Sequence, residues 1–501
     1  MANRRLSQMR NTIENIIKSI TPMAIILVTA GLIDSCNLND RWDDYYENAP
    51  EKTGENILNI IAKDENYSRF YNALVEYGFE TLLSKNQYFT VFVPVNSAFD
   101  GLPEYTEEEW TGILGFHITY AKLLSYEFSD RDLLTIMGKY LKMKKGTDGE
   151  VKIFESTINM DRVDNYCRNG VIHEIDKLLI PMPNIYEFIM SLDSSFSILQ
   201  DFILSMDKKF IDYEKSERIG VDDNGDAIYD TVWRTENYFL DNVAGLNHES
   251  EAYTGFIPGN DHVREALSEV VEYFGNIDDL DEEAYGQLLY ITFSGSFMKG
   301  TYPHADIPDY IISVTGKKYD KSILSFQQTD LVLSNGMVHM LGGMTIPKSF
   351  FLVPIVIECD RKENRKVSNT IYPIEVKSDT RATNGSFLFY GCAFVNDYVE
   401  YTVDMVLKTK YWFIWTGPRQ GPSTYQLSVK DEETGEFIYL GEPVDNWAKG
   451  WFIPVESGSY TFNKFGTKTV RINIVDELPV IGLNAIYIDY IKLVPDEVYN
   501  P

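Results

Sequence analysis

The chain has 501 residues and carries 45 Lys plus Arg against 75 Asp plus Glu, which gives a formal net charge of −30 at pH 7. Its length suits about three domains of ordinary size, and a hydrophobic content of 44% lets each of them bury a core. Such acidity argues against a protein that coats nucleic acid, and four Cys are too few for a disulfide scaffold.

The N-terminal segment has the pattern of a secretory signal peptide. Basic residues, among them Arg4 and Arg5, precede an apolar run from Met23 to Ile33. As a helix this run would rise about 16 Å, which is too short for a hydrocarbon core of about 30 Å. We therefore expect residues 1–35 to be a signal peptide rather than a membrane-spanning helix.

The residues that end this run, Ile33-Asp34-Ser35-Cys36, resemble a bacterial lipobox, with Asp34 where a small or apolar residue is usual. The resemblance implies that Cys36 is lipidated and becomes the first mature residue. The polar, acidic residues that follow are similar to the export tags of Bacteroidota surface lipoproteins. This implies a flexible tether over residues 36–52 and an outer-membrane protein that is held by lipid alone and faces the cell exterior. The alternative is a structural Cys36 beside an ordinary cleaved signal or an uncleaved anchor.

Two motifs recur in the middle of the chain in the same order. The segment 89–96 (FTVFVPVN) is echoed by 253–260 (YTGFIPGN), and the segment 169–173 (NGVIH) is echoed by 335–339 (NGMVH). The spacing between the two motifs is nearly equal in both copies. Matched motifs at matched spacing predict two homologous domains.

These motifs resemble the two conserved blocks of the fasciclin (FAS1) domain. The first copy matches closely, whereas the second is degenerate, with Leu341-Gly342 where the first has Ile175-Asp176. The resemblance implies a fasciclin domain over residues 53–181 and a degenerate one over residues 183–347. Apolar residues at helical spacing precede the strand motif in each copy, which agrees with an α+β architecture.

His173 and His339, in the second motif, invite a metal-binding or catalytic interpretation. No further His, Cys or paired carboxylate stands near either of them at ligand spacing, so we predict structural, hydrogen-bonded histidines. The chain also lacks the G-x-S-x-G, Walker, dinucleotide-binding and H-E-x-x-H motifs. We therefore expect a protein that is not an enzyme and needs no cofactor.

Phe116-His117 resembles the Tyr-His pair that fasciclin domains of adhesion proteins carry between the two blocks. The resemblance implies that Phe116 and His117 contact a protein partner. The residues themselves favour core packing together with a hydrogen bond at a helix end. We place the equivalent position of the second copy at residues 290–291.

The second copy is longer because of an insertion near residues 205–250. Within the insertion, Asp222, Asn224 and Asp226 alternate like calcium ligands, so a structural calcium ion is one interpretation. The Gly and the terminal Glu of a calcium loop are missing, however. Asn224-Gly225 between strand-forming residues predicts the tip of a β-hairpin.

After a linker over residues 348–364, the helical periodicity fades. Alternating apolar residues at 399–403 and 411–415 predict the short strands of a β-sandwich. The segments 398–403 (YVEYTV) and 486–495 (IYIDYIKLVP) resemble galactose-binding-like jelly-roll modules, which include carbohydrate-binding modules. The resemblance implies an all-β jelly roll over residues 365–501.

Trp447 and Trp451 lie in a Gly-containing segment with polar neighbours. Sugar recognition needs flat aromatic faces surrounded by a few amide or carboxylate groups. These two residues are therefore the first glycan-binding candidates, with Asp445 and Asn446 as hydrogen-bonding partners. The resemblance adds Asn484, which lies just before the last strands. Core packing is the alternative for both tryptophans.

Two further pairs of residues belong to this region. Trp412 and Trp415 lie on a predicted strand, and we expect them in the core. Cys359 and Cys392 are either free or joined in a single bridge, and the sequence is compatible with both.

These features together predict a multidomain protein in which two α+β fasciclin domains precede a β-sandwich. By resemblance, we expect a non-catalytic surface lipoprotein that binds an extracellular polysaccharide or glycoconjugate as an accessory to an outer-membrane nutrient importer. Nucleic acid is not an expected partner, and the membrane is contacted through the lipid alone. The alternatives are an adhesin that binds a protein through its fasciclin domains and a structural subunit of a transporter assembly.

Overall fold

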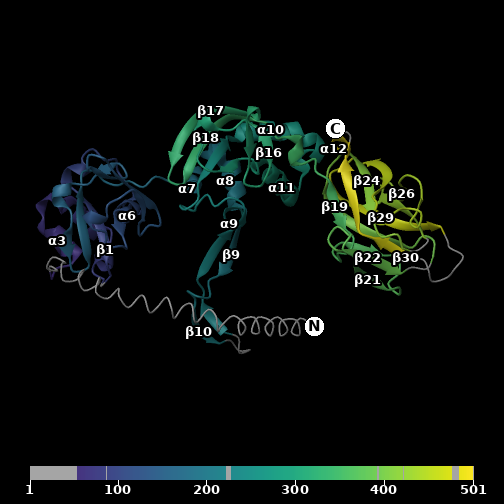
Figure 1. Ribbon diagram of the computed structural model, residues 1–501, viewed down its shortest axis with the longest axis horizontal. Coiled ribbons are helices and arrows are strands. Elements are labelled where there is room, and N and C mark those ends of the chain that lie inside the picture. Colours follow the sequence, from purple (N-terminus) through teal and green to yellow (C-terminus); the bar gives the residue numbers. More distant parts are fainter. Residues whose placement is uncertain are drawn as a thin grey trace. The chain divides into compact units, whose positions relative to one another are not determined.

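The computed structural model describes residues 54–85, 87–221, 227–391, 394–420, 423–476 and 485–499. The chain divides into two compact units, Met1–Pro181 and Met182–Pro501 (Figure 1). Cys36, Cys392, Asn484 and the segment 222–226 lie outside the described residues, so the predictions made for them stay predictions. None of the helices in the described ranges is both long and apolar enough to span a bilayer.

The first unit combines short helices with two β-sheets. The helices are α3 Ile57–Lys63, α4 Ser68–Glu76, α5 Glu80–Leu83 and α6 Glu107–Phe116. The strands are β1 Phe89–Pro94, β2 Ile118–Thr119, β3 Arg131–Leu134, β4 Tyr140–Lys145, β5 Val151–Ile153, β6 Ser156–Thr157, β7 Asn165–Cys167 and β8 Gly170–Ile175. One sheet has the order β2-β1-β8-β7 and the other the order β3-β4-β5-β6.

The two sequence motifs of this unit form the two central strands of its first sheet. β1 and β8 pair in parallel, with Phe89 opposite Gly170 and Phe92 opposite His173. Every residue of both strands is buried, which explains why their sequences are nearly continuous apolar runs. Gly170 has φ +155°, and a Cβ there would lie 2.0 Å from the Phe89 carbonyl oxygen, so only glycine fits.

The second unit begins with an α+β region that repeats this plan. Its helices are α7 Ile185–Ser191, α8 Ser197–Leu204, α9 Tyr238–Asn242, α10 Asn260–Phe274 and α11 Glu282–Phe293. Its strands outside the insertion are β13 Tyr253–Pro258, β14 Phe297–Lys299, β15 Tyr310–Ile312, β16 Lys318–Asp320, β17 Leu324–Leu333 and β18 Gly336–Met344. The main sheet has the order β14-β13-β18-β17, and its parallel pair sets Tyr253 opposite Gly336 and Phe256 opposite His339.

The same polar side chain ties the leading helix to the sheet in both regions. Asn169 accepts a hydrogen bond from the Ile57 amide at 2.9 Å. Asn335 accepts one from the Ile185 amide, also at 2.9 Å. The two sheets therefore share strand order, register and this buried contact, as expected for copies of one ancestral domain.

The insertion forms a two-stranded arm. β9 Asp207–Ile211 pairs with β12 Trp233–Asn237, and β10 Glu217–Val221 pairs with β11 Ala227–Asp230. Figure 1 shows β9 and β10 leading away from α9. In the antiparallel pairing of β10 with β11, Val221 lies opposite Ala227.

The remainder of the second unit is rich in strands. They are β19 Ile355–Glu358, β20 Arg365–Val367, β21 Ile374–Ser378, β22 Ser386–Gly391, β23 Tyr398–Val406, β24 Lys410–Thr416, β25 Thr424–Lys430, β26 Phe437–Tyr439, β27 Val444–Asp445, β28 Val455–Thr461, β29 Gly466–Asp476, β30 Ala485–Ile488 and β31 Tyr490–Pro495, followed by the helix α12 Asp496–Tyr499. The three sheets have the orders β19-β31-β24-β28, β20-β23-β29-β25-β26 and β21-β22-β30. The protein is thus a multi-sheet α+β structure with a β-rich C-terminal region.

Candidate functional site

Trp447 and Trp451 are exposed aromatic residues of a single loop, which connects β27 to β28. Their side chains are 52% and 40% exposed. Aromatic rings bury more apolar area than most side chains, so two solvent-facing indoles on one loop identify a candidate binding surface.

Contacts to a neighbouring segment hold this loop in place. The Phe452 amide donates a hydrogen bond to the Gly417 carbonyl at 3.0 Å, and Lys449 Nζ donates to the same oxygen at 2.6 Å. Asp445 Oδ1 accepts a hydrogen bond from the Trp447 amide at 2.8 Å. Because the backbone is fixed before a ligand arrives, less conformational entropy is lost on binding.

The three predicted hydrogen-bonding residues differ in how they can act. Asp445 is exposed, at the start of the loop. Asn446 is fully buried, and its Nδ2 donates to the Gln420 carbonyl at 2.8 Å, so it positions the loop and does not reach a ligand in solvent. Among the described residues, Asn446 Oδ1 has no hydrogen-bond partner. Asn484 lies outside the described residues.

Each of the two tryptophans of this loop has an arginine on its ring. Arg381 Cζ lies 4.3 Å from the Trp451 ring centroid, and Arg419 Cζ lies 5.1 Å from the Trp447 ring centroid. Asp379 accepts hydrogen bonds of 2.9 and 2.6 Å from Arg381, and this pairing lowers the pKa of Asp379 to about 2. Guanidinium groups beside a stacking face can donate to hydroxyl or carboxylate oxygens. Our sequence analysis missed both arginines, because they come from other loops.

The other tryptophans of this region support the strands. Trp415 is fully buried, as predicted, and Lys449 Nζ lies 5.0 Å from its ring centroid. Burial lowers the pKa of Lys449 to about 8. Trp412 is half-buried rather than in the core: it stacks on Tyr499 at 4.7 Å, and its Nε1 donates to Asp496 at 2.6 Å.

Phe116 and His117, the predicted partner contacts, are 2% and 0% exposed. His117 Nε2 accepts a hydrogen bond from the Leu179 amide at 3.0 Å, so Nδ1 carries the proton and donates to the Ile113 carbonyl at 2.8 Å. Burial lowers the pKa of His117 to about 4. Neither side chain reaches the surface, so the interpretation as a contact site is not retained.

Ser296 occupies the position of His117 in the second α+β region. The Phe92 amide donates to the His117 carbonyl at 3.0 Å, and the Phe256 amide donates to the Ser296 carbonyl at 2.8 Å. Our placement of this position at residues 290–291 is therefore wrong. The error arises because α10 has 15 residues where the first unit has only the four-residue turn Asn96–Phe99, and a shorter stretch after Ser296 offsets this difference, so the motif spacing does not reveal it. A small cavity lined in part by Ser296 lies beside it.

His173 and His339 are structural histidines, as predicted, and both are fully buried. Nε2 of His173 lies 2.8 Å from the Leu123 carbonyl oxygen, and Nε2 of His339 lies 3.0 Å from the Tyr302 carbonyl oxygen. Burial lowers the pKa of both rings. Within the described ranges, no group of three or more His, Cys, Asp or Glu is arranged to hold a metal ion.

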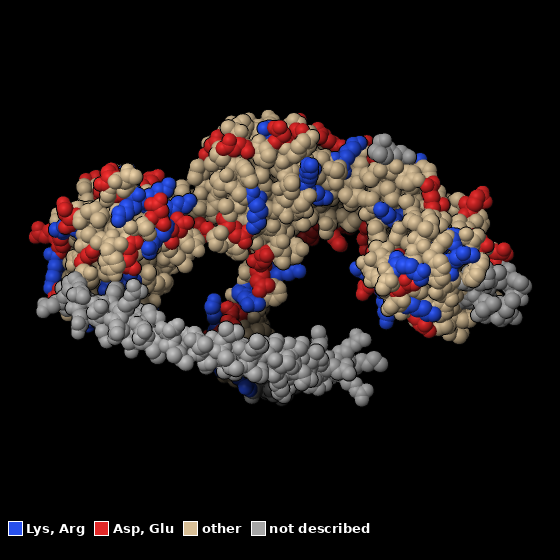
Figure 2. All heavy atoms as spheres, in the orientation of Figure 1, with Lys and Arg blue, Asp and Glu red and all other residues tan. Residues whose placement is uncertain are grey.

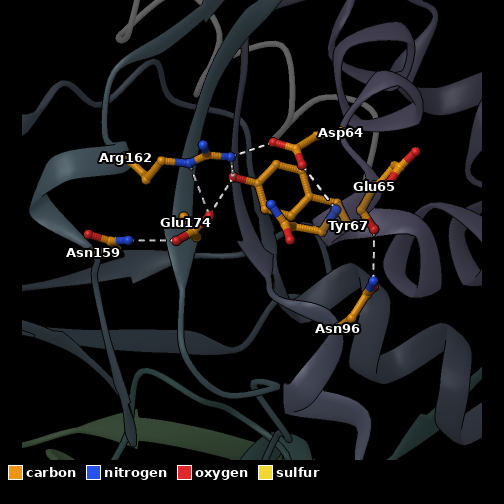
Figure 3. A network of polar contacts seen from close by, with 8 residues as sticks. Asp64, Glu65, Tyr67, Asn96, Asn159, Arg162 and Glu174 are labelled. Carbon is orange, nitrogen blue, oxygen red and sulfur yellow. Dashed lines mark hydrogen bonds and ion pairs between the residues drawn. The ribbon is translucent and has the colours of Figure 1, made fainter.

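Figure 3 shows a polar network in the first unit that the sequence analysis did not single out. Glu174 is 8% exposed and accepts hydrogen bonds from the Tyr67 hydroxyl at 2.8 Å and from Asn159 Nδ2 at 2.6 Å. Arg162 pairs with Glu174 at 3.2 Å and also with Asp64. Because both Glu174 oxygens are engaged within the protein, the network braces the fold rather than offering a binding site.

Two buried titratable groups lie near the first strand of the C-terminal region. Cys359 is free and fully buried, so of the two alternatives for this residue the unbridged one is observed. Burial raises the pKa of its thiol well above the usual range. Asp489 is 2% exposed, and its Oδ2 accepts a hydrogen bond from the Thr383 amide at 3.0 Å. Burial raises the pKa of Asp489.

Comparisons with known proteins agree with the fold of the first unit. Residues 65–181 match the family described as the fasciclin domain. A Synechocystis protein, sll1483, is 31% identical over 134 residues, which cover 25% of this chain and 73% of that protein. Human stabilin-1 is 30% identical over 142 residues, and human periostin is 27% identical over 136 residues. The matched segment spans only 5% of stabilin-1 and 16% of periostin.

Among the solved structures with some likeness are a FAS1 domain pair and a carbohydrate-binding module. A FAS1 domain pair from the insect cell adhesion molecule fasciclin I matches 57% of this chain and 98% of its own, with 15% identity and a TM-score of 0.23. A CBM35 from Paenibacillus barcinonensis matches 28% of this chain and 99% of its own, with 13% identity and a TM-score of 0.21. The sequence match carries the assignment: through residues 65–181, this chain belongs to the fasciclin-domain family.

Proposed function

We propose that the protein is a non-catalytic surface protein that binds a glycan or glycoconjugate through the loop between β27 and β28. The observation that carries this proposal is the pair of half-exposed indoles, Trp447 and Trp451, on one anchored loop with Arg381 and Arg419 on their rings. Flat apolar faces beside fixed polar donors are what a pyranose ring and its hydroxyls require.

We further propose that residues 183–347 form a second, degenerate fasciclin domain and that residues 365–501 form a galactose-binding-like jelly roll. The shared strand order and register of the two parallel pairs support the first assignment. The three antiparallel sheets of the C-terminal region support the second.

Localisation rests on the sequence pattern around Cys36. We propose that lipid at Cys36 anchors the protein to the outer membrane, facing the exterior, where it serves an importer of glycans. Metabolic labelling with palmitate should mark the wild-type chain and not the Cys36→Ala variant, which should be released from the membrane. A wild-type chain that takes up no label would refute the anchor.

Glycan binding is tested by calorimetry with the soluble chain of residues 37–501 and a panel of plant, host and microbial polysaccharides. Trp447→Ala and Trp451→Ala should each weaken the bound polysaccharide about tenfold or more, because each removes a stacking face. Trp233→Ala is the matched control, since Trp233 is 59% exposed but lies on the arm. Equal losses in all three variants, or no binding to any polysaccharide, would contradict the proposal.

A second candidate function is adhesion to a protein through the first unit. Tyr88, Tyr120 and Tyr126 are 46%, 51% and 68% exposed there, and exposed tyrosines are common in protein interfaces. In a pull-down from outer membranes, this function predicts a captured protein that is lost in Tyr120→Ala and Tyr126→Ala but retained in Trp447→Ala.

A further inference from the structure

Beyond the loop, aromatic side chains continue along the outer face of the sheet β21-β22-β30. Phe389 lies opposite Tyr487 in the pairing of β22 with β30, so the two rings share one face. The alternate residues Leu388 and Ile488 are fully buried on the other face, in the core. Phe389 and Tyr487 are half-buried, which marks their face as the outer one.

The rings of this face are in contact with one another and with the loop. The centroids of Phe389 and Tyr487 lie 5.1 Å apart, those of Tyr487 and Phe387 6.5 Å, and those of Phe387 and Phe452 6.0 Å. Arg381 Cζ lies 5.6 Å from the Phe452 centroid and also stacks on the neighbouring Trp451. We call the series Trp451, Arg381, Phe452, Phe387, Tyr487 and Phe389 the aromatic track.

Charged side chains border the far end of the track. Lys377 Nζ lies 3.9 Å from the Phe389 ring centroid, and Glu375 lies directly opposite Phe389 on β21. Lys377 and Glu375 are 3.7 Å apart. The track therefore repeats the chemistry of the loop, in which an aromatic face stands beside groups that can donate to and accept from hydroxyls.

Phe387 is only 2% exposed, so it supports the track from beneath, and the rings that a ligand can reach are those of Trp451, Phe452, Tyr487 and Phe389. A single sugar covers about one ring, whereas this track offers several. We infer that the glycan is an extended chain, whose units run from the loop tryptophans along the aromatic track, so that the protein binds polymer in preference to short saccharides. The inference rests on the proposed function. Two features favour a glycan on the track: the track is continuous with the loop, and charged groups that can bind hydroxyls lie at both of its ends.

The backbone of Phe452 is strained. It has φ +51°, a left-handed conformation that is unfavourable for a bulky aromatic residue. Its ring nevertheless packs edge-on against Phe387 and connects the loop with the sheet. The strained backbone is compensated by the hydrogen bond that the Phe452 amide donates to Gly417.

The test uses the soluble chain of residues 37–501 and two- to eight-unit xylo-, manno- and galacturono-oligosaccharides, measured by calorimetry together with the parent polysaccharides. Wild-type affinity should rise at least about tenfold from the shortest to the longest member of the series that binds. Phe389→Ala and Tyr487→Ala should remove most of that rise and leave the shortest ligand unchanged. Phe389→Tyr keeps the ring and should keep the rise.

Tyr439→Ala serves as the control, because Tyr439 is 46% exposed on β26, in another sheet. Equal wild-type affinity for short and long oligosaccharides would overturn the inference. So would an equal loss of affinity for short and long oligosaccharides in Phe389→Ala. In either case, a loss of affinity in Trp451→Ala would still support the loop as the binding site. Absence of binding to every polysaccharide would overturn the proposed function as well. Melting temperatures of the variants separate a local effect from unfolding.

Discussion

The neutral imidazole of His117 makes two hydrogen bonds. It donates one to the Ile113 carbonyl in α6 and accepts one from the Leu179 amide. Folding lowers its pKa from 6.5 to about 4. Between these two values the unfolded chain binds a proton that the folded chain does not. The folded state is therefore destabilised as the pH falls from about 6.5 towards 4.

The lower pKa of His117 in the folded state reduces the free energy of unfolding by about 3 kcal/mol once the pH lies below both pKa values. In urea titrations, the wild-type first unit should lose stability between pH 7 and pH 4.5, and His117→Gln should flatten that loss while lowering stability at pH 7. An identical slope in His117→Gln would contradict the assignment.

Glu174 has an apolar counterpart in the second sheet, Met340, at the same register position. Its partner Tyr67 likewise corresponds to Phe196, the last residue of a short turn capped by an Asp in both regions. Glu174→Met should cost about 2–3 kcal/mol, because Arg162 and Tyr67 lose their acceptor. Adding Tyr67→Phe and Arg162→Leu should recover most of the loss in thermal unfolding. Strict additivity of the three changes would argue against a coupled network.

At this scale, the sequence could predict buried histidines and exposed loop aromatics but not their partners. The structural role of His173 and His339 could be predicted because their motif contains no further residue that could bind a metal ion. Arg381 and Arg419 could not be predicted, because the fold brings them to Trp451 and Trp447 from separate segments. No periodicity or motif records such a contact.

Among the elements, the parallel pairs depend on a glycine at the start of the second strand. A Cβ on Gly170 would lie 2.0 Å from the Phe89 carbonyl oxygen, and a Cβ on Gly336 would lie 1.9 Å from that of Tyr253. Gly170→Ala and Gly336→Ala should each destabilise their own region by about 3 kcal/mol or more, since the backbone must shift. Denaturant unfolding measures the loss.

Gly112→Ala provides the comparison for both substitutions. Gly112 lies inside α6, and a Cβ there meets nothing within 4 Å. This change should stabilise the first unit by up to about 1 kcal/mol. A destabilised Gly112→Ala or a neutral Gly170→Ala would refute the steric argument.

The central strands were predictable because a buried parallel pair needs continuous apolar runs, and the chain contains such runs twice. The helix α11 was misaligned because the long helix α10 before it is offset by a shorter stretch after it, which leaves the spacing of the flanking motifs nearly unchanged. The strand alternation at 399–403 and 411–415 was sufficient to predict β23 and β24. The assignment of strands to three separate sheets was not predictable, because the hydrophobic period is the same in each.

At the scale of the whole molecule, the second α+β region packs against the β-rich region of its own unit. In the second unit, the Lys408 amide donates to the Tyr273 carbonyl at 2.8 Å, and the rings of Phe274 and Phe465 lie 5.1 Å apart. These contacts join the end of α10 to the β-rich region. The second unit should consequently unfold as one cooperative body.

Calorimetry of the soluble chain should therefore show two transitions, one for each unit, rather than three. Gly170→Ala should move one transition and Gly336→Ala the other. A separate transition for the β-rich region would show that the contacts around Tyr273 do not couple it to the preceding region.

On the described part of the face that Figure 2 shows, charge is distributed rather than gathered at one place. On the face shown in Figure 2, Lys and Arg side chains are interspersed with Asp and Glu. With a net charge of −30, the protein is expected to be repelled by anionic lipid surfaces. Cosedimentation with anionic vesicles should therefore be negligible for the soluble chain, at low as well as at physiological salt.

The parallel pairing of β1 with β8 has a consequence for synthesis. Phe89 cannot meet Gly170 until the ribosome has made nearly the whole of the first unit, and Tyr253 waits in the same way for Gly336. Contacts that are so distant along the chain form slowly and late. A nascent polypeptide with this topology therefore keeps its first central strand without its parallel partner until the last strand of the unit has been made.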